Sequence, residues 1–254
     1  MSVRLTSLGS GSKGNATLIQ YLGRSIVIDS GFSCKALEER LGERGVHPES
    51  IDAILVTHEH SDHFKGVSAF SNKYNCQCWL SRGTSLHHLA DKLKSPNIFC
   101  SHSCFHIGEF EVTPVAVPHD AREACQFVVN VSGFKLGILT DLGHITPHVE
   151  REYNNLDALL LEFNHDSEML LNGRYPQKLK QRVGGSLGHL SNTQSLAFLK
   201  SINTSNLQLL AAMHLSEENN SRMLVENLLK KVNLHNAKVV IADQDAGFDW
   251  FEIK

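Results

Sequence analysis

The segment "VTHEHSDHFKG" places four potential metal ligands within six residues. They are His58, His60, Asp62 and His63, in the pattern His-x-His-x-Asp-His. Imidazole and carboxylate are donors that divalent zinc, manganese and iron bind readily. The segment follows an apolar run, so a loop at the end of a strand can turn several of these side chains toward one point. A polar solvated loop is the alternative, but histidine is an uncommon residue, and four ligands at this spacing favour a metal centre.

Four further residues of the same chemical types follow apolar runs elsewhere in the chain. They are Asp29 in "IVIDSG", His119 in "VAVPHD", Asp141 in "ILTDLGH" and His214 in "LLAAMH". Each has an ordinary interpretation when taken alone, since aspartate suits a turn and histidine can lie in the core or at the surface. Strand ends on one rim of a sandwich can nevertheless converge from distant parts of a chain. We therefore expect all four residues to lie beside the cluster at His58–His63.

Strands and helices interleave along the chain, and no shift in composition marks a domain boundary. We expect one domain over residues 1–254, of the α/β class, with two central sheets and helices outside them. The ligand cluster follows a predicted buried strand at residues 51–57, which is nearly all apolar. Helices with a serine cap are predicted from Ser33 to Gly45, from Ser191 to Lys200 and from Ser216 to Lys231.

The composition excludes some classes of function. With a net charge of -3 and a pI near 6.6, the chain has no overall positive charge that would attract nucleic acid or a membrane, so any polyanion must be bound by a local group of residues. No apolar run approaches the ~18 residues of a membrane span, and the first residues do not resemble a secretion signal. We expect a cytoplasmic protein whose six cysteines are reduced. A structural zinc on Cys76, Cys78, Cys100, His102 and Cys104 is a less favoured alternative.

Taken in order, the ligand motifs resemble the metallo-β-lactamase-fold hydrolases over essentially the whole chain. The resemblance implies an αββα four-layer sandwich that binds two divalent metal ions, with zinc, manganese and iron as candidates. It implies that the first metal is held by His58, His60 and His119, the second by Asp62, His63 and His214, with Asp141 bridging both. Asp29 is expected to orient a ligand imidazole rather than to bind metal.

A centre of this kind is suited to hydrolysis at phosphorus. Two cations roughly 4 Å apart can share a hydroxide as the nucleophile and stabilise both the attacking and the departing oxygen. Asp141 stands where β-lactamases of this fold usually present a cysteine. The resemblance therefore disfavours antibiotic hydrolysis and favours the phosphodiesterase and nuclease branches, with Asp62 among the residues that catalysis requires.

Four stretches are similar to the YycJ/WalJ-type subfamily, described in general terms as DNA exonucleases that act from the 5′ end. They are "SLGSGSKGN", "THEHSDH", "NHDSEMLLNGRYPQKLKQRV" and "GHLSN". The first is not a nucleotide-binding P-loop, because Lys13 precedes Gly14 and strands rather than a helix follow. Its Ser10, Ser12 and Asn15 are expected to contact a phosphate near the metals, although a tight turn also explains these residues.

Two histidines near the predicted cleft are candidates for contact with the substrate. His189 in "GHLSN" precedes a predicted helix, and in related tRNA-processing endonucleases a histidine in a similar short motif gives a proton to the leaving oxygen. We expect the same role here, with packing beneath the helix as the alternative. His165 in "LEFNHD" follows another predicted strand and is expected to assist substrate binding, with a surface turn as the alternative.

The segment "GRYPQKLKQR" carries four cations directly before the His189 motif. Lys178 and Lys180, together with Arg174 and Arg182, are expected to hold the backbone of a DNA strand, and Tyr175 could stack on a base. A solvated helix face is the alternative.

The sequence thus predicts a metal-dependent phosphodiesterase, most specifically a DNA exonuclease acting from the 5′ end. A metal-bridging hydroxide would attack the phosphate, and His189 would protonate the leaving oxygen. The alternative is a hydrolase of the same fold that acts on a small molecule, such as a cyclic phosphodiester or a thioester.

Overall fold

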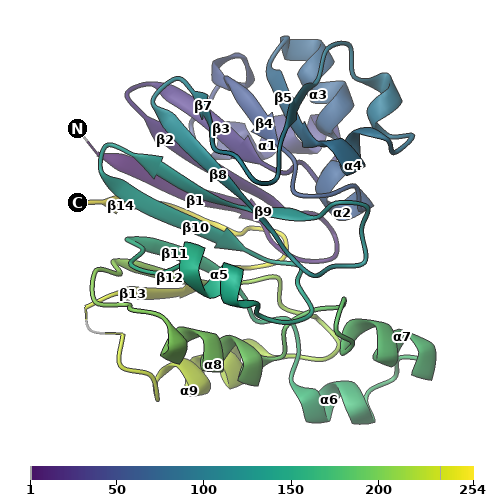
Figure 1. Cartoon of the computed structure of the whole chain (residues 1–254), viewed down its shortest axis with the longest axis vertical. Coiled ribbons are helices and arrows are strands. Elements are labelled where there is room, and N and C mark those ends of the chain that lie inside the picture. Colours follow the sequence, from purple (N-terminus) through teal and green to yellow (C-terminus); the bar gives the residue numbers. More distant parts are fainter. Residues whose placement is uncertain (1, 235) are drawn as a thin grey trace.

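Two seven-stranded sheets form the centre of the molecule in the computed structural model, which describes residues 2–234 and 236–254 (Figure 1). The first sheet has the order β14-β1-β2-β3-β4-β5-β6 and consists of β14 (Phe248–Ile253), β1 (Val3–Gly9), β2 (Ala16–Tyr21), β3 (Arg24–Ile28), β4 (Ala53–Leu55), β5 (Gln77–Ser81) and β6 (Asn97–Phe99). The second has the order β13-β12-β11-β10-β9-β8-β7 and consists of β13 (Lys238–Ile241), β12 (Leu209–Met213), β11 (Ala158–Glu162), β10 (Phe134–Leu139), β9 (Cys125–Val131), β8 (Phe110–Ala116) and β7 (Phe105–Ile107).

Each sheet is apolar on both faces, because one face packs on the other sheet and the other on helices. In β3, Ile26 and Ile28 belong to the core between the sheets, whereas Val27 between them belongs to the core beneath the outer helices. Phe127 of β9 and Leu136 of β10 fill the central core from the second sheet. This alternation follows from the two-residue period of a strand and requires four layers.

Helices cover both outer faces. The first sheet is covered by α1 (Cys34–Glu43) and α3 (Val67–Tyr74), and the second by α5 (Pro147–Glu152), α8 (Asn192–Ser201) and α9 (Arg222–Leu229). Shorter helices are α2 (Ser61–Phe64), α4 (Arg82–Ser85), α6 (Ser167–Asn172) and α7 (Gln177–Val183), with single 3-10 turns at Pro48–Ser50 and Ala90–Lys92. The predicted αββα sandwich of the α/β class is confirmed.

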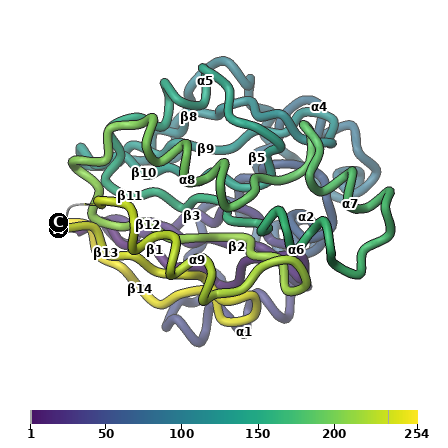
Figure 2. Tube along the Cα trace, turned by 90° about the horizontal axis from the view of Figure 1, so that it is seen from below, coloured from purple at the N-terminus to yellow at the C-terminus, as the bar shows by residue number. Residues whose placement is uncertain are grey.

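Helices α6 and α7 lie outside these layers. No residue of α7 is buried, unlike the helices that cover the sheets. Figures 1 and 2 show both helices on the side of the molecule where α2 lies, while the two termini lie on the opposite side in Figure 1. The segment from α6 to α7 therefore stands beside the strand ends that the ligand motifs follow.

Two of the three predicted helix caps are confirmed. Ser33 and Ser191 accept backbone N–H hydrogen bonds at the starts of α1 and α8. The predicted start of the third helix is wrong, because the hydroxyl of Ser216 accepts the N–H of Asn219 within a turn. Helix α9 begins later, behind Ser221, whose side chain caps it.

Candidate metal centre

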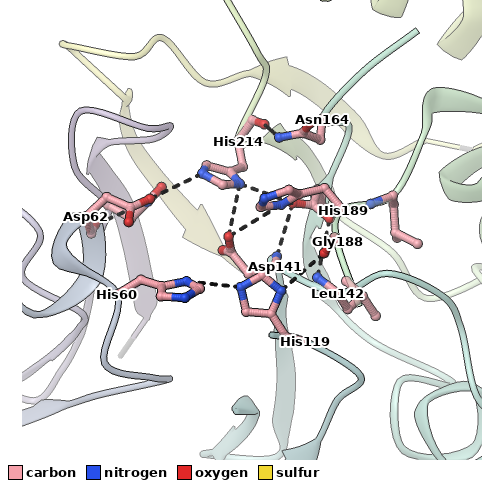
Figure 3. A network of polar contacts seen from close by, with 12 residues as sticks. His60, Asp62, His119, Asp141, Leu142, Asn164, Gly188, His189 and His214 are labelled. Carbon is pink, nitrogen blue, oxygen red and sulfur yellow. Dashed lines mark hydrogen bonds and ion pairs between the residues drawn. The ribbon is translucent and has the colours of Figure 1, made fainter. Parts of the chain in front are cut away.

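The seven predicted metal ligands converge at one end of the two sheets, beside His189. Figure 3 shows His60, Asp62, His119, Asp141 and His214 around it. The first sheet supplies His58 and His60 from the loop after β4, and Asp62 and His63 from α2; the second supplies His119 after β8, Asp141 after β10 and His214 after β12. Ligands from both sheets therefore meet across the rim of the sandwich.

The backbone turns sharply at three of the strand ends that carry site residues. Asp29, Asp141 and His214 have φ angles of 64°, 54° and 57°. This left-handed region is uncommon for residues other than glycine and costs about 1 kcal/mol or more at each position. Packing of the surrounding sheets maintains these turns, and backbone strain of this kind is typical of functional sites.

The first predicted ligand set has the spacing of a tetrahedral site. The Nδ1 atom of His60 lies 3.0 Å from Nε2 of His58 and 3.2 Å from Nε2 of His119. Zinc–nitrogen bonds of about 2.0–2.1 Å in a tetrahedron would separate such atoms by about 3.4 Å. The three nitrogens are therefore already close to the positions that one ion requires.

The second set surrounds the carboxylates of Asp62 and Asp141. The Oδ2 atom of Asp62 lies 3.5 Å from Nε2 of His63 and 3.7 Å from Nε2 of His214. Asp141 Oδ2 lies 3.3 Å from Nε2 of His63. Potential ligand atoms of Asp141, His63 and His58 all lie within 4.8 Å of one another, and His58 belongs to the first set. Asp141 thus lies next to a histidine of each predicted set.

The hydrogen bonds of the first set favour a metal ion over a proton. Thr57 Oγ1 donates to the carboxylate of Asp29, so it accepts from Nδ1 of His58, and Nε2 of His58 is left with a lone pair. His119 Nδ1 donates to the Gly188 carbonyl, which leaves Nε2 of His119 with a lone pair too. Both lone pairs face His60 Nδ1, and a single proton on that nitrogen cannot be donated to both of them. In the second set, the buried Asp141 Oδ2 has no hydrogen bond within the described residues.

The charges of the site also favour cations. Burial lowers the pKa of His58 well below its usual range and lowers that of His119, so both rings are neutral, as metal binding requires. Burial also lowers the pKa of His63 and His214, but the negative charges of neighbouring carboxylates outweigh this effect, and Asp141 contributes most among them. They raise the pKa of His63 well above its usual range and that of His214 to about 10. A divalent cation would neutralise the same negative field.

Asp29 has the orienting position that was predicted for it. Its Oδ2 accepts a hydrogen bond of 2.7 Å from Nδ1 of His63 and one of 2.8 Å from the hydroxyl of Thr57, while Oδ1 accepts the N–H of Thr57. Thr57 in turn holds His58. One buried carboxylate therefore fixes an imidazole of each ligand set.

Glu162, at the end of β11, is a functional candidate that the sequence reasoning missed. Its fully buried carboxylate accepts hydrogen bonds from Nδ1 of His189 at 2.8 Å, Nδ1 of His214 at 3.1 Å and the N–H of Leu190 at 2.8 Å. Burial opposes ionisation, but His189 and His214 lower the pKa of Glu162 to about 2. The sequence did contain a signal for Glu162, since this acid stands at the end of the apolar run "DALLLEF". Asp29 was identified by the same kind of position.

His189 lies in the wall of the cleft next to the ligands. Its side chain is 19 % exposed, and Nδ1 lies 3.6 Å from Asp141 Oδ1 as well as 2.8 Å from Glu162. The preceding Gly188 holds His119 through its carbonyl. The "GHLSN" motif thus both lines the cleft and supports a ligand of the first set.

Of the three residues predicted to contact phosphate, only Ser12 lines the cleft. Ser10 is buried, and its hydroxyl accepts the N–H of His214. Asn15 is buried too, and its amide bonds to the carbonyls of Gly11 and Asp62 and lies 3.1 Å from Nε2 of His63. Ser10 and Asn15 therefore hold the loop and the ligands in place, because their polar atoms are used inside the protein.

The cleft that contains the centre has a volume of about 380 Å³. Three other predicted substrate contacts lie away from it. Lys180 donates to the carbonyl of Leu171 and, with His165, lines a separate cavity between α6 and α7. Lys178 is exposed and is not among the residues that line the cleft. Lys178 and Lys180 lie on α7, where successive residues point in different directions, so a basic segment need not turn all its cations toward the cleft.

The cysteines form no metal site among the described residues. Cys76 and Cys78 are buried while Cys100 and Cys104 are exposed, and none belongs to a group of potential ligands in residues 2–234 and 236–254. In the same ranges, no helix has both the length and the apolar character that crossing a membrane requires.

Comparisons with known proteins agree with this geometry. A model of the beta-lactamase superfamily domain matches residues 24–214. The chain is 30% identical over 236 residues to exodeoxyribonuclease YycJ of Bacillus anthracis, covering 91% of this chain and 89% of that protein. It is 33% identical over 226 residues to exodeoxyribonuclease WalJ of Streptococcus pneumoniae, covering 85% and 83%. The metallo-beta-lactamase fold protein YhfI from Bacillus subtilis is similar in structure, with a TM-score of 0.73 at 16% identity over 98% of this chain and 99% of YhfI.

Proposed function

The chain belongs to the beta-lactamase superfamily and is a metal-dependent hydrolase, and from this premise we propose that it is a DNA exonuclease acting from the 5′ end. The observation that carries the proposal is the pairing of His189 with Glu162 at 2.8 Å, beside Asp141, the carboxylate that we propose to bridge the two metals. The names of the relatives YycJ and WalJ support DNA as the substrate.

The residues that would hold the metals are those of the two sets described above. We assign His58, His60 and His119 to one ion, Asp62, His63 and His214 to the other, and Asp141 to both. When bound, two divalent cations activate water and stabilise negative charge on the oxygens of the phosphate. Zinc, manganese and iron all suit imidazole and carboxylate donors.

His189 is the proton donor in this proposal, and Glu162 is a positioning residue. The carboxylate of Glu162 holds Nδ1, so the proton given to the substrate comes from Nε2. In the hydrolysis, an oxygen of water bonds to phosphorus as the bond from phosphorus to the leaving oxygen breaks. His189 gives its proton to that oxygen, and the proton released by the water restores the site. Assistance of this kind contributes on the order of 100-fold.

The experiment is the digestion of DNA duplexes labelled at the 5′ or the 3′ end, with protein loaded with manganese or zinc and an Asp62→Ala control. We expect 5′ label to be released first and the control to be inactive. Early release of 3′ label would contradict the polarity. Intact DNA, together with hydrolysis of bis(para-nitrophenyl) phosphate, would instead support the small-molecule alternative.

A further inference from the structure

Helix α7 and the residues before it form one wall of the cleft beside the candidate metal centre. Tyr175, Leu179, Arg182 and Val183 all line the cleft. Within α7, the spacing of Leu179, Arg182 and Val183 places them along one face of the helix, and Tyr175 lies just before its first turn. Lys180 and its neighbours on the opposite face line the cavity against α6. The helix therefore presents a defined set of side chains to the metal centre.

The chemistry of this face is mixed rather than purely cationic. Tyr175, Leu179 and Val183 are half-buried and offer an aromatic ring with apolar side chains beside it. Across the cleft, Leu215 adds a further apolar side chain next to the ligand His214. Phosphate groups make no use of an apolar surface, whereas the face of a nucleobase stacks on aromatic and apolar side chains.

Arg182 supplies a fixed cation at the same wall. Its Nε donates a hydrogen bond of 2.6 Å to Asp120 Oδ2, and Oδ1 of Asp120 lies 3.5 Å from Nε2 of His119. Within the described residues, the terminal nitrogens of the Arg182 guanidinium have no hydrogen bond. A guanidinium anchored through Nε keeps two donors that can bind a phosphate oxygen pair.

We propose that this face of α7 is a subsite for one unpaired nucleotide, in which Tyr175 and Leu179 hold the base and Arg182 binds a phosphate next to the one that is cleaved. The inference rests on the proposed nuclease function and adds the form of DNA that the cleft accepts. A cleft of about 380 Å³ is at the lower end of volumes that enclose one small ligand. A volume of this size accommodates one nucleotide, and the ring of Tyr175 offers a stacking surface for one base, so we expect a duplex end to open before it is cleaved.

The first test compares two duplexes of equal length, one blunt and one with three unpaired nucleotides at the end that the enzyme degrades. Opening a pair costs free energy, so we expect wild-type kcat/KM to be about tenfold higher on the unpaired end. Equal values on the two duplexes would refute the single-nucleotide subsite. If the wild-type protein degrades neither, the proposed function fails, which is a different result.

The second test separates stacking from charge on the duplex with the unpaired end. We expect Tyr175→Ala to lower kcat/KM about tenfold, and Tyr175→Phe to retain it, because stacking requires the ring and not the hydroxyl. Arg182→Gln should lower kcat/KM more than Lys178→Gln, which makes the same change of charge on the same helix outside the cleft. Wild-type kcat/KM in Tyr175→Ala, or equal losses in Arg182→Gln and Lys178→Gln, would overturn the proposal while leaving the nuclease function intact.

Discussion

Replacing Glu162 with glutamine tests whether this residue positions the proton donor. The carboxylate accepts five hydrogen bonds, three at Oε1 and two at Oε2. The partners of Oε1 are the N–H of Asp141, His189 Nδ1 and His214 Nδ1, and those of Oε2 are the N–H groups of Leu142 and Leu190. A glutamine has only one oxygen, so its NH₂ group must face donors on one side.

The less costly orientation keeps the oxygen toward the two imidazoles. The N–H of Leu190, now 2.8 Å from a carboxylate oxygen, then faces another donor. Losing a hydrogen bond to a buried charged group costs about 1.5–3 kcal/mol. The bonds that remain lose charge assistance and become roughly half as strong. Together these effects lower the free energy of unfolding by about 4 kcal/mol, which in a chain of this size lowers Tm by roughly 10 °C.

The assay measures Tm, bound metal and kcat for the same preparations. We expect Glu162→Gln, assayed at saturating metal, to lose about 100-fold in kcat because His189 is no longer held by a charge, and to bind metal more weakly because His214 also loses its carboxylate partner. Glu59→Gln is the control, since the buried carboxylate of Glu59 accepts the backbone N–H of Arg122 and the hydroxyl of Thr84 and, within the described residues, bonds to no site histidine. It should lower Tm with little effect on kcat. Wild-type kcat in Glu162→Gln, or a loss no larger than that of the control, would refute the positioning role.

Three further predictions test the centre and its support, the last of them with a control variant. Asp141→Asn should reduce bound metal from two ions to one or none per chain by elemental analysis, and full occupancy would remove its bridging role. Asp29→Asn should weaken metal binding about 10–100-fold in competition with a chelator, because its imidazole partner is no longer held by a carboxylate; unchanged affinity would contradict this. Gly31→Ala should lower Tm and metal content together, since its Cβ would lie 1.7 Å from the carbonyl oxygen of Asp62. Gly42→Ala, whose Cβ meets nothing within 4 Å in a helix, should instead raise stability by up to about 1 kcal/mol, as thermal denaturation would show.

The sequence by itself determined the ligand types and the strand ends that carry them. His58, His60, Asp62 and His63 are neighbours in the chain, so their convergence needs only a loop. The apolar runs before Asp29, His119, Asp141 and His214 identify buried strands by composition alone. These local patterns predicted two central sheets with helices outside them, while the αββα fold family and the assignment of the ligands to two metals came from the family resemblance.

Only the tertiary structure decided which polar groups face the cleft and which support it. Ser10 and Asn15 occur in the same loop as Ser12, yet they point inward, because the loop packs on strands that are distant in sequence. Glu162 acquires its partners from the loop after β10, the "GHLSN" motif and the end of β12. These contacts depend on strand order, which no local periodicity specifies.

The same holds for α7. Composition identified a basic segment, but a helix distributes its cations around its axis, and only the packing of α7 beside the cleft separates Arg182 from Lys178 and Lys180. Residue type and spacing therefore specified the chemistry available to this protein. The packing of elements far apart in the chain determined which side chains can reach a substrate, because side-chain direction is set by neighbours that the local sequence does not contain.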